Sequence, residues 1–207
     1  MPSGSADRFA TVEAGGCIRD PSGIGTHRML GIRNEDFMQD AVTMVAGASL
    51  ADGLIDVHVE ITNDNTGHHI PTDSPLRFLI LVVLATDSRG DTLHRLNGPV
   101  LPGWCGQGDT DEGYYAGLPG EVYARILREH WTEKEPTASY WMPTMEVSDT
   151  RIGAFQTARA DFSFAAPAGG GARVRVDLVF RRAFIGLADQ KGWDRKDILI
   201  ARSILVI

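Results

Sequence analysis

The sequence is poor in cysteine and in long apolar runs, and both shortages exclude classes of protein. Two cysteines in 207 residues, Cys17 and Cys105, are too few for a disulfide framework, and neither belongs to a CxxC pair. No apolar run approaches the ~20 residues that a membrane-spanning helix needs. The opening MPSGSADRF has neither the basic start nor the apolar core of a signal peptide, which by itself predicts a cytoplasmic protein.

Basic residues and catalytic motifs are also scarce. Lys and Arg number 20 against 27 Asp and Glu, a formal charge of -7, so a nucleic-acid backbone would be repelled. The sequence has no GxSxG, no HExxH, no phosphate-binding GxxxxGKS or GxxxxGKT, and no GxGxxG that opens a helix after a strand. We therefore predict a protein that neither binds nucleic acid nor acts as an enzyme.

Alternation of apolar and polar residues predicts a mainly β fold. Residues 54–62 alternate strictly, whereas residues 76–86 are apolar on both faces, as in a central strand. Two more alternating segments, 158–164 and 173–180, are separated by PAGGGA and are expected to form a hairpin. Further strands are expected at 92–96, 121–127 and 198–207. A total of about seven strands predicts an antiparallel immunoglobulin-like β-sandwich, with a barrel as the alternative.

The chain is predicted to divide into three parts. Residues 1–33 are rich in Gly, Ser and Pro and are expected to form an irregular arm. Residues 34–47 are expected to form one short helix, because Asn34 can cap it and Gly47 can end it. Residues 48–207 form the β-sandwich domain in this prediction.

Two adjacent histidines, His68 and His69, lie where two apolar segments meet. Gly67 and Pro71 bracket them, so a constrained backbone is expected to fix the directions of the rings. Neighbouring residues of an extended segment point in opposite directions, so the pair rarely binds one ion. We expect His68 to point inward or across the strand junction, where its ring fixes the loop through a hydrogen bond or a ligand, and His69 to point outward. The alternative is a buried, purely structural histidine bonded to a backbone carbonyl, with an exposed neighbour.

An acidic turn offers a second candidate ion site. Asp109 and Asp111 stand two residues apart before a glycine, which imitates the start of a calcium-binding loop. The bidentate Glu that closes such a loop does not follow at the expected spacing. A solvated acidic turn is therefore the favoured interpretation, with calcium as a weak candidate.

Four stretches of the sequence follow one another in an order that resembles a known family. They are VHVEITNDNTGHHIPTDSPLRFLILVVLATDSRGDTL, LPGEVYARIL, SDTRIGAFQTARADFSF and VRVDLVFRRAF. Together they resemble the C-terminal β-sandwich of multihaem c-type cytochromes, whose pattern is a strand ending in VxN or TN, GHxxPTG, an apolar strand, DxxG, PG, DxRI and a strand ending in YR or FR. The residues on this pattern are Gly67, His68, Pro71, Thr72, Asp87, Gly90, Pro119, Gly120, Asp149, Arg151, Ile152 and Arg181. Asp73 stands where the pattern has Gly.

The same resemblance gives meaning to the start of the chain. In such cytochromes a haem-attachment CxxCH is often followed by Met-Pro and later by a segment like THRMLG, whose His can ligate a neighbouring haem. This chain opens with Met-Pro and carries GTHRMLG at 25–31, so it looks like a cytochrome cut just after its last haem motif. The resemblance implies that His27 and His68 are axial haem ligands. Without the resemblance, a surface histidine of the arm is an equally good interpretation of His27.

Because CxxCH is absent from the chain, no c-type haem can be attached to it covalently. The haem would belong to a missing upstream segment or to a partner chain, either a haem-bearing cytochrome segment or a redox partner protein. The resemblance then implies a non-catalytic electron-transfer module that is periplasmic or extracellular.

Two alternatives from other classes stay open. One is a periplasmic copper- or zinc-binding protein, since imidazole suits both metals. The histidines that would join His68 in such a site are His58, His94 and His130. The other is a cofactor-free immunoglobulin-like interaction module.

Overall fold

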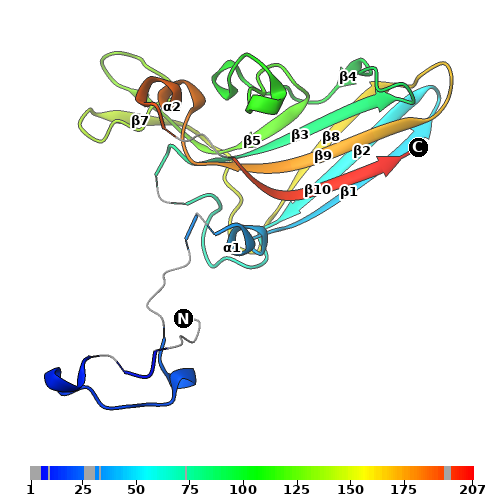
Figure 1. The fold of residues 1–207 in the computed structure, drawn as a ribbon. Helices are drawn as coiled ribbons and strands as arrows, with labels where there is room; N and C mark the ends of the chain where they lie inside the picture. The colour runs from blue at the N-terminus through cyan, green and yellow to red at the C-terminus, as the bar shows by residue number, and fades with distance from the viewer. Residues whose placement is uncertain (1–5, 9, 26–30, 33, 73, 194–196) are drawn as a thin grey trace. The chain divides into compact units, whose positions relative to one another are not determined.

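The computed structural model describes residues 6–8, 10–25, 31–32, 34–72, 74–193 and 197–207. The chain divides into two compact units, Met1–Met38 and Gln39–Ile207, and the second contains the β-sheets (Figure 1). Two short 3-10 turns, η1 (Val12–Ala14) and η2 (Pro21–Gly23), lie among the described residues of the first unit. His27 lies outside the described residues, so its predicted role as a ligand stays a prediction.

Helix α1, Glu35–Gln39, begins where it was expected but is shorter than the predicted span 34–47. The Asn34 side chain caps it by accepting a backbone N–H at 2.7 Å. The predicted continuation of the helix to residue 47 was wrong, because Thr43–Ala51 form strand β1 instead. β-Branched residues such as Val45 lose little side-chain freedom in a strand, and pairing along the whole of β1 satisfies the backbone more completely than a short isolated helix could.

The first sheet has the order β1-β2-β8-β4 and is antiparallel throughout. Its strands beyond β1 are β2 (Leu54–Thr62), β8 (Thr157–Ala165) and β4 (Arg95–Asn97). Along β2, alternate side chains are buried, as the period of two predicted. Ile55 and Ile61 are completely buried, so the opposite face of the strand presents His58 and its neighbours to solvent.

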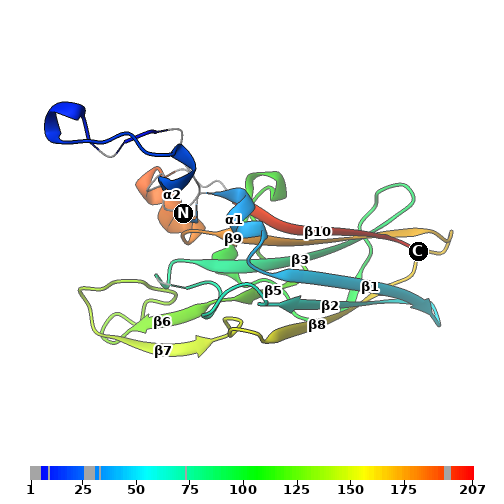
Figure 2. The same ribbon diagram turned by 90° about the horizontal axis from the view of Figure 1, so that it is seen from below.

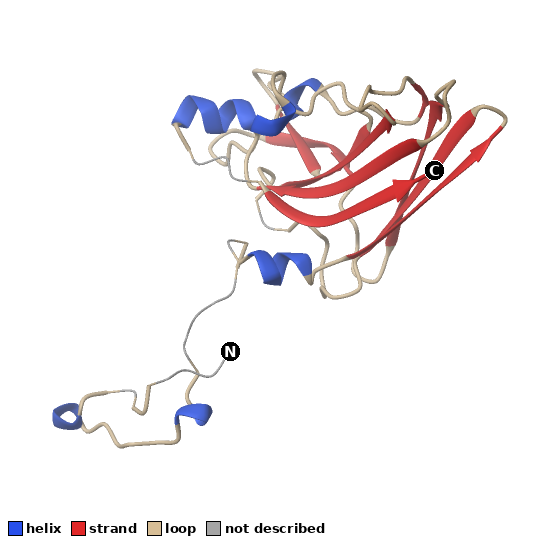
Figure 3. Cartoon of the chain, turned by 45° about the vertical axis from the view of Figure 1, so that its right-hand side comes forward, coloured by secondary structure: helices blue, strands red, loops and turns tan. Residues whose placement is uncertain are grey.

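The second sheet has the order β10-β9-β3-β5 (Figure 2). Its strands are β10 (Ile198–Val206), β9 (Ala172–Arg181), β3 (Phe78–Asp87) and β5 (Gly120–Tyr123). The first six residues of β3 are buried on both faces, which confirms the predicted central strand. The two sheets face each other across a core of β-branched and aromatic side chains, so the fold is the predicted antiparallel β-sandwich (Figure 3).

The predicted hairpin between residues 158–164 and 173–180 was wrong. Strand β8 pairs with β2 and β4, whereas β9 pairs with β3 and β10, so the segment between them crosses from one sheet to the other. Both strands do alternate, and both bury their apolar face in the shared core. Alternation reports which face of a strand is buried, and it does not report the neighbouring strand.

A two-stranded hairpin extends from the sandwich between β5 and β8. The segment 121–127, expected to be one strand, is broken at Ala124 into β5 and β6 (Arg125–Glu129), and β6 pairs with β7 (Thr144–Asp149). Ala124 is held at the break by Thr150, which donates its backbone N–H to the Ala124 carbonyl at 2.9 Å and accepts the Ala124 N–H at 3.0 Å.

The loop of this hairpin is built around a buried carboxylate. Glu129 is 5% exposed, and hydroxyl groups from its own loop surround its two oxygens. The hydroxyl donors belong to Thr132, Thr137 and Ser139. These hydrogen bonds lower the pKa of Glu129 to about 2. The same loop exposes the aromatic side chains of Trp131, Tyr140 and Trp141.

The long connection 97–120 covers the outer face of the second sheet together with a helix that the sequence did not indicate. This helix, α2 (Ile185–Lys191), ends at Gly192 in the left-handed conformation (φ 63°). The connection contains the 3-10 turns η3 (Gly103–Cys105) and η4 (Thr110–Glu112), and its apolar residues pack on β3 and on the residues before α2. None of the described helices has the length and apolar character needed to cross a lipid bilayer.

A buried arginine joins this connection to the sheet. Arg181, 4% exposed, pairs with Asp197 through two nitrogens, at 2.9 and 2.6 Å. Its remaining N–H groups donate to the carbonyl oxygens of Cys105 and Gly113, which lie in the connection. The charge is therefore both paired and hydrogen-bonded, as a buried guanidinium requires.

Candidate functional site

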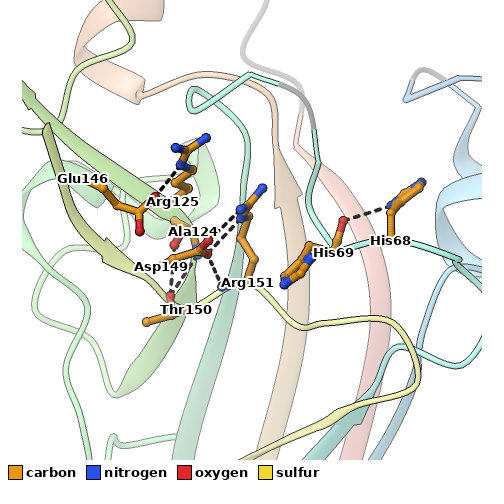
Figure 4. Close-up of polar contacts among 8 residues, drawn as sticks. All are labelled: His68, His69, Ala124, Arg125, Glu146, Asp149, Thr150 and Arg151. Carbon is orange, nitrogen blue, oxygen red and sulfur yellow. Dashed lines mark hydrogen bonds and ion pairs between the residues drawn. The ribbon is translucent and has the colours of Figure 1, made fainter. Parts of the chain in front are cut away.

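The histidine loop meets the segment after β7 at one end of the sandwich (Figure 4). Ile70 and Ile152 exchange two backbone hydrogen bonds, of 2.9 and 3.0 Å. The stretches GHHIPT and DTRI, far apart in sequence, are therefore directly joined. We call this junction, residues 63–71 with 149–156, the histidine junction.

Asn63 holds the histidine junction from inside and was missed in the sequence analysis. Asn63 is completely buried, and its side-chain N–H groups donate to the carbonyl oxygens of His68 at 2.8 Å and Ile152 at 3.0 Å. Its side-chain oxygen accepts the hydroxyl proton of Thr66 at 2.6 Å. Its backbone N–H donates to the Gln156 carbonyl at 3.0 Å. Every polar group of this buried side chain is thus used, as burial demands.

His68 is exposed, so the expectation that its ring points inward was wrong. The loop is fixed by the Asn63 amide instead, and a Cβ on Gly67 would meet open space, so no close backbone approach requires that glycine. The predicted contrast in direction does hold, because the rings of His68 and His69 lie on opposite sides of the loop in Figure 4. His69 is exposed as well.

The His68 ring is nevertheless oriented by a hydrogen bond. Its Nδ1 lies 3.0 Å from the His69 carbonyl oxygen. A carbonyl oxygen only accepts, so Nδ1 is the donor, and in the tautomer that makes this bond the lone pair lies on Nε2. This is the arrangement that orients metal-ligating histidines in proteins, in which one nitrogen donates to a carbonyl and the other faces the metal.

A charged pair lies beside the His69 ring. Asp149 accepts two hydrogen bonds from the Arg151 guanidinium, at 2.8 and 2.6 Å, and one from the Arg151 backbone at 3.1 Å. These bonds, with a smaller contribution from His69, hold the pKa of Asp149 below its usual range. A second pair, Arg125 with Glu146 at 2.7 Å, continues along the β6–β7 hairpin (Figure 4).

Most other positions of the cytochrome pattern have structural roles. A Cβ on Gly120 would lie 2.1 Å from the Leu81 carbonyl oxygen, so only glycine fits beside β3. Asp87 caps the turn after β3 by accepting the backbone N–H of Arg89 at 2.9 Å. Arg181 clamps the long connection. His68 differs from these residues because it is exposed and its ring is hydrogen-bonded to the carbonyl of its own neighbour, His69.

The other candidate histidines do not gather with His68. His58 lies on the outer face of β2, its Nδ1 at 2.6 Å from Asp161 and its Nε2 at 3.5 Å from Glu60. These carboxylates raise the pKa of His58, so both ring nitrogens favour protons over a metal. His94 precedes β4, and its carbonyl accepts the backbone N–H at the far end of β8.

His130 directly follows β6, at the start of the hairpin loop, where its backbone N–H donates to the Pro143 carbonyl at 2.9 Å. Within the described part of the chain, no group of three or more His, Cys, Asp or Glu side chains is placed to hold a metal ion. In the acidic turn, the Asp109 carboxylate accepts the backbone N–H of Asp111 at 2.9 Å and so caps η4. The two cysteines are free, Cys17 exposed and Cys105 buried.

Comparison with known proteins gives one informative likeness. No protein-family model matches the chain, and no curated protein matches it. Among solved structures, the fold is similar to that of a penta-haem cytochrome c552 from Thermochromatium tepidum, with a TM-score of 0.65. The chain shares its fold with part of a multihaem cytochrome. The likeness covers 87% of this chain at 20% sequence identity.

The match covers 43% of the cytochrome c552 chain, so this protein spans less than half the length of that neighbour. At this identity the likeness concerns the fold. The relationship to multihaem cytochromes that the ordered sequence pattern indicates stays a prediction.

The donor chemistry of His68 fits that of a histidine ligand to haem iron. His68 is exposed, its loop is rigidly held by Asn63, and its Nε2 is the donor atom that haem iron takes from histidine. A single exposed imidazole suits an axial position. It does not suit a copper or zinc site, which needs several protein ligands.

Proposed function

We propose that this chain is the non-catalytic β-sandwich module of an exported, electron-transferring multihaem c-type cytochrome. The observation that carries the proposal is the likeness in fold, over 87% of the chain, to a penta-haem cytochrome c552. The ordered GHxxPT and DxRI stretches support it independently, since they meet in space at the histidine junction. The haem is carried by another segment of the polypeptide or by a partner chain, and export follows because c-type haem is attached outside the cytoplasm.

Within this function, the imidazole of His68 would ligate the iron of one haem. The haem provides the iron that takes up and releases the electron. The chain provides position and basicity: the His69 carbonyl keeps the proton on Nδ1 of His68, and Asn63 holds the backbone of the loop. His27, outside the described residues, is proposed as a second ligand on the sequence resemblance alone.

The role of His68 can be tested with a defined haem. N-acetylated microperoxidase, a peptide that carries a c-type haem with one open axial position, is titrated with the protein and followed by its visible spectrum. We expect a low-spin bis-imidazole species whose affinity falls at least about tenfold in His68→Ala. The matched variant His69→Ala should bind with the affinity of the wild type. Equal affinity in the two variants, or a greater loss in His69→Ala, would show that His68 is not the ligand.

A further inference from the structure

Phe155 combines two features that rarely occur together. Its side chain is 77% exposed, and its backbone has φ 61°, in the left-handed region. It occupies the third position of a four-residue turn closed by the Gln156 N–H donating to the Gly153 carbonyl at 3.0 Å. A positive φ at this position normally selects Gly or Asn, and a bulky residue there is strained. The strain brings no benefit to the core, because the ring is outside it.

The surrounding structure imposes this conformation. The Phe155 N–H donates to the Asn63 carbonyl at 2.7 Å, and the Asn63 N–H donates to the next residue's carbonyl at 3.0 Å. Strain that is held so firmly, at an exposed aromatic residue, points to a function outside folding.

Phe155 and His68 are both hydrogen-bonded to the same residue, Asn63. The backbone carbonyl of Asn63 holds Phe155, and the side-chain amide of Asn63 holds the His68 carbonyl at 2.8 Å. The exposed aromatic ring and the exposed imidazole are therefore fixed to the same buried asparagine. A porphyrin bound through its iron at His68 would be a wide apolar ring, and an exposed aromatic side chain on the same junction is a group that such a ring can pack against.

We propose that Phe155 is a haem-contact residue that packs against the porphyrin whose iron His68 ligates. This inference rests on the proposed function and adds a second binding residue to it. Glycine would be easier to accommodate at this left-handed position. Phe155 is retained there because a large apolar ring is needed.

The experiment uses the full chain and N-acetylated microperoxidase, with Phe155→Gly and Phe155→Ala compared with wild type. Each variant is titrated to obtain the dissociation constant of the low-spin species, and each is unfolded thermally without haem. We expect both variants to bind about three- to tenfold more weakly with an unchanged low-spin spectrum, the range of one aromatic contact. Phe155→Gly should also melt at a higher temperature than wild type, because glycine relieves the strained φ.

Stability that rises while affinity falls would not be seen for a residue with a merely structural role. Tyr140→Ala is the matched control, since Tyr140 is 93% exposed at the hairpin loop, and it should change neither quantity. Unchanged affinity in both Phe155 variants would overturn this inference and leave the role of His68 standing. Equal weakening in Tyr140→Ala would also overturn it. The absence of any His68-dependent low-spin species in wild type would remove the proposed ligation and this inference together.

Discussion

Replacing Asn63 with Ala should destabilise the fold more than any other change at an uncharged polar residue of the histidine junction. The side chain donates two hydrogen bonds and accepts one, and each is worth about 1 kcal/mol net, so about 3 kcal/mol is at stake. Part of this is recovered. Without the Asn63 side chain, the single hydroxyl proton of Thr66 is free to be donated to the His68 carbonyl, 2.8 Å away. The Ile152 carbonyl keeps the Ile70 N–H at 2.9 Å. We therefore expect a loss of about 2–3 kcal/mol in the free energy of unfolding.

The nearly isosteric Asn63→Asp sharpens this prediction. At neutral pH it places a carboxylate against two carbonyl oxygens in a buried site, so its cost should equal or exceed that of Asn63→Ala. Burial raises the folded pKa of such a carboxyl. The penalty should therefore shrink as the pH falls and the protonated form, which can donate one hydrogen bond, is populated.

Urea unfolding followed by tryptophan fluorescence measures both variants, with Asn65→Ala as control. Asn65 is exposed and donates one bond, to the Asp40 carbonyl at 2.9 Å, so its loss should cost less than about 1 kcal/mol. A loss below about 1 kcal/mol for Asn63→Ala, or an Asn63→Asp variant as stable as wild type at neutral pH, would refute the central position assigned to this amide.

Three further outcomes are expected. Arg181→Met should lower the free energy of unfolding by about 3–5 kcal/mol, measured by denaturant midpoint, because it leaves buried partners unpaired, and a loss under about 1 kcal/mol would contradict the clamp. The pKa of Glu129 is lowered from 4.5 to about 2, so the stability that its carboxylate gives the fold is complete above pH 4.5 and is lost as the pH falls toward 2. Glu129→Gln should therefore flatten the melting temperature as a function of pH in this range. An unchanged slope would argue against the role of the carboxylate. With an aromatic disulfide reagent, Cys17 should react in the native protein whereas Cys105, buried and with its pKa raised to about 12, should react only on unfolding; two reactive native thiols would contradict its burial.

Much of the sandwich could be predicted from the sequence because hydrophobic period is a local signal. Strand β2 was predicted residue for residue, and the doubly apolar β3 was recognised as central. Pairing is not local, and for that reason β8 and β9 were joined in a hairpin although they lie in different sheets. The short α2 was missed because few of its residues are buried, so it lacks the amphipathic stripe of a longer helix.

The candidate site was predicted less completely, for a different reason. The motif singled out His68, but the residue that fixes the loop is Asn63, one of two Asn residues in that stretch. The sequence carried two signals for it: Asn63 comes directly after an alternating strand, and it is the Asn of the TN that ends the first strand of the family pattern. The strained φ of Phe155 left no trace in the sequence, since the residue itself argues against a left-handed turn.

The proposal that this chain is part of a multihaem cytochrome is tested most directly by measuring covalent haem in the native protein. The sandwich is isolated from its source with an antibody raised against residues 39–207, denatured in detergent, and assayed as the reduced pyridine haemochrome and by haem staining of the separated polypeptides. We predict thioether-linked haem on the polypeptide that carries the sandwich, or on a chain that co-isolates with it in fixed ratio. A sandwich polypeptide free of covalent haem, with no haem-bearing chain in fixed ratio to it, would contradict the proposed function.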